Sequence, residues 1–282
     1  MISEGKMLKI RMNIVPTAVN VCTVKGMETY MNLIIQMLDF NGLQWTTIII
    51  TALFVGFSKT GIGGISMLAI PLLAAAFGGK DSTGILLPML LVGDIFAIWY
   101  YRRSVEWHNV FRPLPWAVIG LALGVFVGSY ISDRTFITLI GVIVLFCLGI
   151  LIYTEKKGKD FKVPNDAWFY IIVGILSGFA SMIGNAAGPI FSIYLLALGF
   201  RKNNFMGTNA WFFFLINLIK LPLQIFVWHN LGINTLTTTF LMIPIITVGA
   251  VLGFYILKKI NEKFFRYIVI IMTAIAALRL LI

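Results

Sequence analysis

The chain has 282 residues, of which 59% are hydrophobic and 12% are charged, and its mean hydropathy is +0.94. Soluble domains carry about 25% charged residues, so this composition excludes an ordinary soluble protein, a disordered chain and a disulfide-stapled secreted domain. The net charge of +11 would indicate nucleic acid as a partner if the protein were soluble. Because most basic residues lie between long apolar runs, we interpret the chain as a polytopic membrane protein that contacts the lipid bilayer and no nucleic acid.

Residues 1–44 form an N-terminal extension ahead of the apolar segments. Its basic residues are followed by Pro16, and no small-residue cleavage site stands out, so the extension does not read as a cleavable signal peptide. Met27 and Met31 are alternative start sites. The apolar residues between 33 and 40 predict a short amphipathic helix at the membrane interface.

Ten apolar segments follow this extension. A spanning helix needs about 20 residues, and by this measure the first, second, sixth and seventh segments are short. Each short pair is joined by a Gly-rich stretch, which is typical of discontinuous helices that meet near the bilayer midplane; short or strongly tilted helices are the alternative. The segments are 45–58, 62–77, 83–101, 113–131, 135–153, 167–181, 187–199, 205–228, 236–257 and 264–281.

The two halves of the chain align at an offset of 123 residues, which indicates an internal duplication. A repeat of five segments is odd, so the second copy should be inverted relative to the first. We expect an all-α polytopic membrane protein with inverted repeats at 45–153 and 167–282, each beginning with a broken, Gly-interrupted helical hairpin, and a cytoplasmic linker at 154–166. The matched pairs include Trp45 and Trp168, Ser58 and Ser181, Gly61 and Gly184, Gly84 and Gly207, and, after a two-residue shift, the GxxxGxY patterns at 124–130 and 249–255.

The basic residues of the loops indicate the orientation. One side of the predicted topology has twelve of them, and the loops of the other side contain Lys80 and Arg134. By the positive-inside rule the first side is cytoplasmic, so both termini are extracytoplasmic. The GxxxG pairs should allow close helix packing within the chain or at a homodimer interface. The twelve residues are Arg102, Arg103, Arg112, Lys156, Lys157, Lys159, Lys162, Arg201, Lys202, Lys258, Lys259 and Lys263.

The two breaks inside the short pairs are candidate anion sites. They read GFSKTGIGG at 56–64 and GFASMIGNAAGP at 178–189, and neither matches a phosphate-loop or dinucleotide motif. We expect the following half-helices to begin at Gly63–Gly64 and at Ala187–Gly188, with Pro189 in the first turn. Because helix N-termini carry unpaired N–H groups and partial positive charge, two inverted breaks would direct two positive ends at a single anion.

Polar side chains near the breaks supply donors and charge for such an anion. The alternative for each hydroxyl is a hydrogen bond to its own helix backbone, and the alternative for Lys59 is snorkelling or pairing with an acidic residue. The candidate substrate-binding residues are Ser58, Lys59, Thr60, Gly61, Gly63, Gly64, Ser181, Gly184, Asn185, Gly188 and Lys220.

Three further polar residues lie deep in long apolar segments. Asp94 and Lys220 are about 12 and 13 Å from the nearest segment ends at 1.5 Å per residue, and Asn217 is the repeat partner of Asp94. Ionisable groups inside a membrane are costly and are usually functional. Lys220 could supply a second counter-charge and Asp94 a proton-coupling carboxylate, with Asn217 beside it. Alternatively, Asp94 forms an ion pair with Lys220 or Lys59 that braces two helices.

Other chemistry finds little support in the sequence. Cys22 and Cys147 belong to no CxxC motif or Cys/His cluster, so we expect two inert thiols, no metal and no cofactor. An intramembrane enzyme would need a GxSxG, HExxH or paired-carboxylate signature, and the sequence has none. We therefore expect no enzymatic activity.

The two breaks also carry a resemblance to a known family. The pattern Gly56-x-Ser58-x-x-Gly61-x-Gly63-Gly64, and Gly174-x-x-x-Gly178 leading into Gly184-Asn185-x-x-Gly188-Pro189, resemble the paired glycine motifs of the sulfite exporter TauE/SafE family, which includes toluene sulfonate uptake permeases. The resemblance covers about residues 45–282. It maps the Gly-rich loops of the family onto Gly61, Gly63, Gly64, Gly184, Asn185 and Gly188, with Asn185 and Ala186 standing where glycines are common.

This resemblance implies secondary transport of sulfite, sulfonates or related organosulfur anions across the cytoplasmic membrane of a prokaryote. Together with the residues, it predicts an exporter that works by alternating access. An anion channel and a non-transporting membrane scaffold are the alternatives.

Overall fold

The computed structural model describes residues 40–61, 66–132 and 167–259, with single positions between 134 and 142 and between 261 and 278. Within these residues all regular structure is helical, which confirms the all-α expectation. The expected interfacial helix, most of segments 135–153 and 264–281, the linker and both cysteines lie outside the described residues. The helices are α2 (Gly42–Thr60), α3 (Ser66–Phe77), α4 (Gly79–Tyr101), η1 (Arg102–Ser104), α5 (Trp107–Phe111), α6 (Leu114–Tyr130), α8 (Ala167–Gly184), α9 (Gly188–Ala197), α10 (Lys202–Phe226) and α11 (Ile233–Lys259).

Helix length separates two classes of element. The described part of α3 has 12 residues and α9 has 10. At about 18 and 15 Å, both are too short to cross a hydrocarbon core of about 30 Å. Helix α5 has 5 residues and belongs with α6 to one long stretch. The sixth segment was expected to be short, but α8 reaches 18 residues and is long enough to span. The five helical stretches that are long and apolar enough to cross a membrane are Gly79–Ser104, Trp107–Tyr130, Ala167–Gly184, Lys202–Phe226 and Ile233–Ile256.

The second predicted break is present between α8 and α9. Helix α8 ends at Gly184, and Asn185 adopts a positive φ of 55°, a left-handed conformation that asparagine enters more readily than most residues. Helix α9 begins at Gly188 with Pro189 in its first turn, as predicted. In the first half, α2 ends at Thr60 and the described part of α3 begins at Ser66, so the predicted start at Gly63–Gly64 lies outside the described residues.

Two close helix pairs each join a helix of the first half to a helix of the second half: α2 packs along α11, and α6 packs along α8. Glycines make both contacts close. A Cβ on Gly56 would lie 2.0 Å from the Ile246 carbonyl oxygen, and one on Gly178 would lie 1.9 Å from the Ala117 carbonyl oxygen. In lipid, helix association depends on such close packing, because the tails are as apolar as the side chains.

The GxxxG glycines belong to the same two pairs. Gly249 and Gly253 on α11 abut the backbone of α2, and Gly124 on α6 abuts Met182 and the Phe179 carbonyl oxygen on α8. The prediction that these motifs pack helices within the chain is therefore confirmed for these three glycines.

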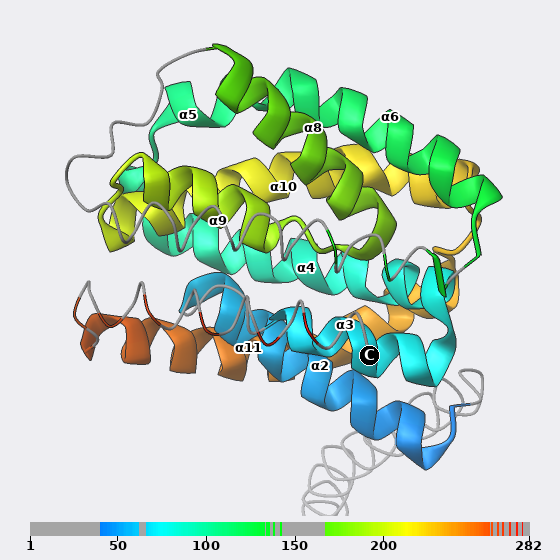
Figure 1. The fold of residues 1–282 in the computed structure, drawn as a ribbon. Helices are drawn as coiled ribbons and strands as arrows, with labels where there is room; N and C mark the ends of the chain where they lie inside the picture. The colour runs from blue at the N-terminus through cyan, green and yellow to red at the C-terminus, as the bar shows by residue number, and fades with distance from the viewer. Residues whose placement is uncertain are drawn as a thin grey trace, which may run out of the picture. The chain divides into compact units, whose positions relative to one another are not determined.

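Helices α4 and α10 are antiparallel and lie against each other between these pairs (Figure 1). At one end, Gly84 near the start of α4 meets the backbone of Asn230, just beyond α10. At the other end, Gly207 near the start of α10 meets the backbone of Tyr101 and Ser104. The polar residues discussed below lie along this central pair.

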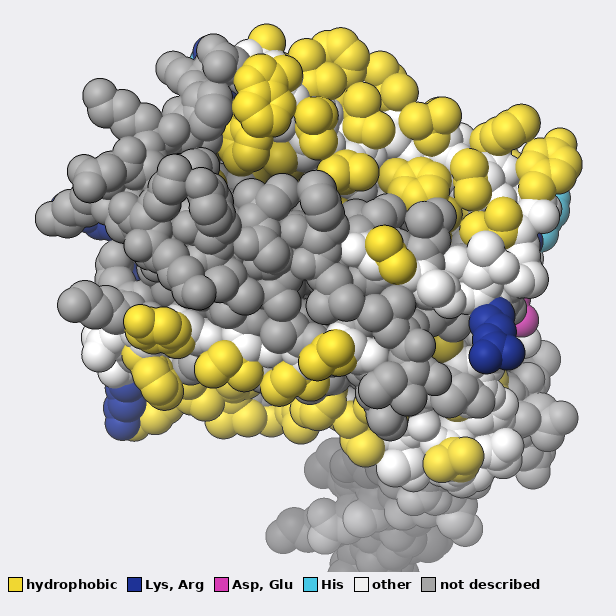
Figure 2. All heavy atoms as spheres, in the orientation of Figure 1, with side chains coloured by type: hydrophobic (Ala, Val, Ile, Leu, Met, Phe, Trp, Pro, Cys, Tyr) yellow, Lys and Arg dark blue, Asp and Glu magenta, His cyan; other side chains and the backbone are white. Residues whose placement is uncertain are grey.

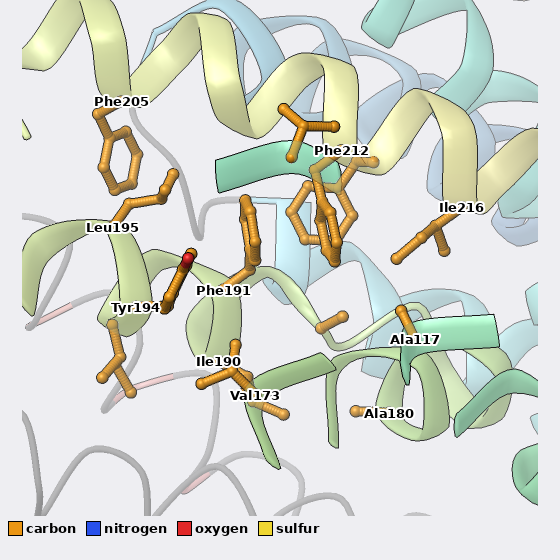
Figure 3. Close-up of a cluster of buried hydrophobic side chains, with 14 of the residues drawn as sticks. Ala117, Val173, Ala180, Ile190, Phe191, Tyr194, Leu195, Phe205, Phe212 and Ile216 are labelled. Atoms are coloured by element: carbon orange, nitrogen blue, oxygen red, sulfur yellow. The ribbon is translucent and has the colours of Figure 1, made fainter. Parts of the chain in front are cut away.

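An aromatic cluster fills the space between α9 and α10 (Figure 3). The rings of Phe191 and Phe212 stack with their centroids 3.7 Å apart and their planes inclined by 6°. Tyr194 packs against Phe191, and its hydroxyl donates to the Asn109 side chain at 3.1 Å. These contacts fix the short helix α9 against the long helix α10, so the break that precedes it is held in place.

Many large hydrophobic side chains of the described residues are exposed, and Figure 2 shows groups of them along two edges of one face. Large apolar residues such as Phe126 on α6 and Phe240 on α11 are 65% and 72% exposed. In water such a surface would drive aggregation, whereas in a bilayer it faces lipid.

Candidate functional site

Two fully buried residues in the described part of the chain carry charged side chains, Asp94 on α4 and Lys220 on α10, each 0% exposed. A third charged group, Lys59 near the end of α2, has a side chain that is 10% exposed. Burying a charge is costly unless it is paired or hydrogen-bonded. The partners of these three groups therefore define the chemistry of the site.

Asp94 is held from two sides. The Lys59 ammonium lies 2.7 Å from Asp94 Oδ1, and the Asn217 amide donates to Asp94 Oδ2 at 2.7 Å. Gly93 leaves room for this pairing, because a Cβ there would approach Lys59 Cγ to 3.0 Å. Lys59 Nζ also lies 4.8 Å from the ring centroid of Phe213, within cation–π range. The cluster joins α2, α4 and α10 and is electrically neutral.

Lys220 has a different environment. Its ammonium donates to the Ser181 carbonyl oxygen at 2.7 Å, to Ser181 Oγ at 3.3 Å and to Asn185 Oδ1. The three protons of an ammonium group are thus matched by three oxygens, all of them neutral. These oxygens come from the end of α8 and from the break before α9, so Lys220 anchors the predicted anion site to α10.

The two clusters share one face of α10. Asn217 and Lys220 are three residues apart, and residues at this spacing are neighbours on a helix surface, with Cβ atoms about 5–6 Å apart. Asp94 and Lys59 cancel, so Lys220 leaves the combined cluster with a formal excess of one positive charge among the described residues.

Thr83 and Gln224 belong to the same polar region and were not identified from the sequence. The Asn185 amide donates to the Thr83 carbonyl oxygen at 3.3 Å, and the Gln224 amide donates to Thr83 Oγ1 at 3.4 Å. Gln224 follows Lys220 by four residues, so it lies on the same face of α10. A polar residue one turn from a buried lysine in an apolar segment was a signal that could have found it.

Two of the remaining residues predicted to bind substrate, Thr60 and Gly61, lie in the contact between α2 and α11. The Thr60 hydroxyl contacts the carbonyl oxygens of Gly56 and Ala250 at 3.0 and 2.7 Å, and a Cβ on Gly61 would lie 2.6 Å from Gly253 Cα. In this structure these two residues serve the α2–α11 contact.

Other predicted positions lie closer to the breaks in the chain. Ser58 is buried on α2, Gly184 ends α8 and Gly188 begins α9. Gly63 and Gly64 lie outside the described residues.

This arrangement suits a small anion. A lysine whose acceptors are all neutral can exchange one of them for an anionic oxygen, and the start of α9 adds N–H groups and a partial positive charge nearby.

A sequence model of the sulfite exporter TauE/SafE family matches residues 48–280, which spans both halves and both breaks. The chain belongs to the TauE/SafE family. Searches among curated proteins and solved structures gave no match.

Membership in the TauE/SafE family makes the chain a multi-pass membrane protein and a transporter of sulfur-containing anions. The resemblance inferred from the glycine motifs is thereby confirmed. The family is one of transporters, which agrees with the expectation that the chain is not an enzyme.

Proposed function

We propose that this TauE/SafE protein is a secondary transporter that exports a small sulfur oxyanion, such as sulfite or an organosulfonate, by alternating access. The observation that carries the proposal is the environment of Lys220, which is fully buried and is held by neutral oxygens of Ser181 and Asn185. Burying an ammonium group without a counter-charge is costly. Binding of an anion at this place would supply that counter-charge.

The proposed binding set is small. Lys220 supplies the full charge, Ser181 and Asn185 supply neutral polar groups, and the first N–H groups of α9 at Gly188 supply the positive end of a helix. Lys59 is already paired with Asp94, so its charge becomes available only when that pair opens. Asp94 is then the proposed proton-coupling carboxylate, with Asn217 as its neighbour.

Reciprocal packing supports an inverted-repeat carrier. The first helix of each half packs against a later helix of the other half, as α2 does with α11 and α8 with α6. The central helices α4 and α10 meet with Gly84 and Gly207, a matched pair of the 123-residue repeat, at opposite ends. In such folds, alternating access is a rocking of one repeat against the other around a fixed central site.

The negative charge of the substrate favours the proposed direction, export. An anion leaves a negative cell interior downhill by about 2.3 kcal/mol per charge for each 100 mV, so export needs no coupled proton. We propose the cytoplasmic membrane of a prokaryote as the location, with the Arg102–Arg103 end of α4 inside and both termini outside. Three of the four GxxxG glycines, Gly124, Gly249 and Gly253, pack helices within the chain, so a homodimer would not use these three.

The test is flux into proteoliposomes. The purified chain is reconstituted, and uptake of a panel of sulfur oxyanions is measured with and without imposed voltage and pH gradients. The Lys220→Met variant is measured in the same way. We expect uptake that responds to voltage and shows counterflow, and loss of both with Lys220→Met. Flux far above carrier rates without counterflow would indicate an anion channel. Absence of both binding and flux would indicate a scaffold.

A further inference from the structure

The hydroxyl of Thr83 fixes the orientation of two side-chain amides. It donates to the Lys80 carbonyl oxygen at 2.7 Å, and a carbonyl oxygen can only accept, so the single hydroxyl proton is used there. Thr83 Oγ1 must therefore act as acceptor toward Gln224 Nε2 at 3.4 Å and Asn230 Nδ2 at 3.1 Å. Asn230 Nδ2 also donates to the Lys80 carbonyl oxygen at 2.7 Å, which fixes this amide a second time.

This orientation leaves two acceptors without a donor. Gln224 Oε1 and Asn230 Oδ1 are both buried, and no donor from the described residues reaches either of them. Gln224 as a residue is 0% exposed. An unsatisfied buried acceptor costs about 1–3 kcal/mol, so two of them in one cluster call for an explanation.

The acceptors lie beside the proposed anion site. Gln224 is one helical turn beyond Lys220 on α10, where Cβ atoms are about 5–6 Å apart. Asn185 connects the two places, because it accepts from the Lys220 ammonium and donates to the Thr83 carbonyl oxygen at 3.3 Å. Among the described residues, one continuous network therefore has a cation without a counter-charge at one end and acceptors without a donor at the other.

We propose that Gln224 Oε1 and Asn230 Oδ1 form a second subsite that accepts a hydrogen-bond donor of the substrate, so that the preferred substrate is a sulfonate with a hydroxyl or ammonium group at its other end. This inference rests on the proposed transport of sulfur oxyanions. The sulfonate would bind Lys220, and the hydroxyl or ammonium group would satisfy the two oxygens.

The charge of Lys220 favours this occupant over an inorganic cation. A bare cation at Gln224 would meet a like charge one turn away, which is unfavourable in a low-dielectric interior. A hydroxysulfonate or aminosulfonate brings its own negative charge to Lys220. A site built to pair with a hydroxyl or ammonium group rejects an analogue that lacks it, because its buried acceptors then stay unpaired.

The test compares three sulfonates of similar size: ethanesulfonate, 2-hydroxyethanesulfonate and 2-aminoethanesulfonate. Their Kd values for the full-length protein in detergent are measured by thermal stabilisation, and their fluxes in proteoliposomes. We expect at least one of the two substituted sulfonates to bind about tenfold more tightly than ethanesulfonate, the equivalent of one hydrogen bond of about 1.4 kcal/mol. The hydroxyl and ammonium arms show which donor the subsite takes.

Two variants remove the subsite in different ways. Gln224→Met removes one acceptor at similar size, and Thr83→Val removes the hydroxyl that orients the Gln224 amide, while Asn230 keeps its bond to the Lys80 carbonyl oxygen. We expect the tenfold ratio to fall toward one in either variant. Thr239→Val is the matched control, because Thr239 is a buried threonine whose hydroxyl donates to the Thr235 carbonyl oxygen on its own helix, α11, at 2.9 Å. This variant should keep the ratio.

Each result supports or overturns the subsite. Equal binding of all three sulfonates by the wild-type protein, or a ratio that survives in a variant that is folded, overturns it and leaves the proposed transport intact. If the wild-type protein neither binds nor transports sulfite or any sulfonate, the proposed function fails, and the subsite fails with it. If one variant does not fold, the other still decides the ratio.

Discussion

The Asn217 amide donates to Asp94 Oδ2 at 2.7 Å, and these two residues are a pair that the predicted 123-residue repeat aligns with each other. Equivalent residues of two elements related by a two-fold axis touch only where the axis passes between them. This contact therefore supports an axis between α4 and α10 at the depth of the buried charges. In the same alignment, Lys59 corresponds to Met182, and Lys220 corresponds to Ala97. The charged residues are therefore not repeated: the first half contributes the Lys59–Asp94 ion pair, and the second half contributes the cation Lys220.

We expect Lys59 and Asp94 to depend on each other for stability. Lys59→Met and Asp94→Asn should each destabilise the protein, by up to about 3–5 kcal/mol, because breaking a buried pair leaves one charge uncompensated. The double variant Lys59→Met/Asp94→Asn should recover most of the loss, because both charges are removed. Thermal unfolding in detergent measures all three variants.

Transport separates the two roles of this pair. The part of the flux that responds to an imposed pH gradient should stay lost in the double variant, because the proposed coupling carboxylate is absent. Recovery of this part of the flux together with stability would assign the pair to bracing alone.

Lys220→Met should separate stability from binding. Removing a buried charge without a counter-charge also removes its desolvation cost, but it takes the donor away from Ser181 Oγ and Asn185 Oδ1. Because these two effects oppose each other, the melting temperature of the apo protein should change little. The apparent affinity for sulfite, measured by thermal stabilisation, should fall at least tenfold, because a charge-assisted hydrogen bond of about 1.5–3 kcal/mol is lost.

Lys80→Met is the control for this variant, because Lys80 lies in the first turn of α4 and its side chain has no place in the proposed site. It should bind sulfite as the wild type does. Unchanged sulfite affinity in Lys220→Met would remove Lys220 from the site.

The elements of this fold that the sequence predicted are those set by local chemistry. Long apolar runs predicted where α4, α6, α10 and α11 lie in the sequence, because a segment that spans lipid must form all its backbone hydrogen bonds within itself. The break after Gly184 and the start of α9 at Gly188 followed from Gly, Asn and Pro, whose backbone preferences are local.

Local sequence patterns could not predict which side chains of distant helices would contact each other. Asp94 had two candidate partners at similar depth, and the rotation of α2 and α10 about their axes selected Lys59. Thr60 appeared to be a donor for the anion, but its hydroxyl is used by the α2–α11 contact, which no local pattern predicts. Gln224 was missed because its importance comes from Thr83, which is 141 residues away in sequence.

Close packing of α2 on α11 makes a sharp prediction for Gly56. A Cβ there would lie 2.0 Å from the Ile246 carbonyl oxygen, so Gly56→Ala should separate the helices and destabilise the protein by about 1–3 kcal/mol. Gly42→Ala is the matched control on the same helix, because a Cβ at Gly42 meets nothing within 4 Å. A lower melting temperature for Gly56→Ala than for Gly42→Ala in detergent is expected, and equal values would contradict the contact.

The proposed orientation can be tested at the two ends of α10. Asn203 lies in its first turn, beside the basic end of α4, and His229 lies just beyond its last residue, Phe226. In a background in which Cys22 and Cys147 are replaced by Ser, we expect His229→Cys to react with a membrane-impermeant maleimide added to intact cells. Asn203→Cys should react only after the membrane is opened, because twelve basic residues of the predicted loops share its side and are retained in the cytoplasm. Labelling of Asn203→Cys in intact cells, with His229→Cys protected, would invert the orientation and place both termini inside the cell.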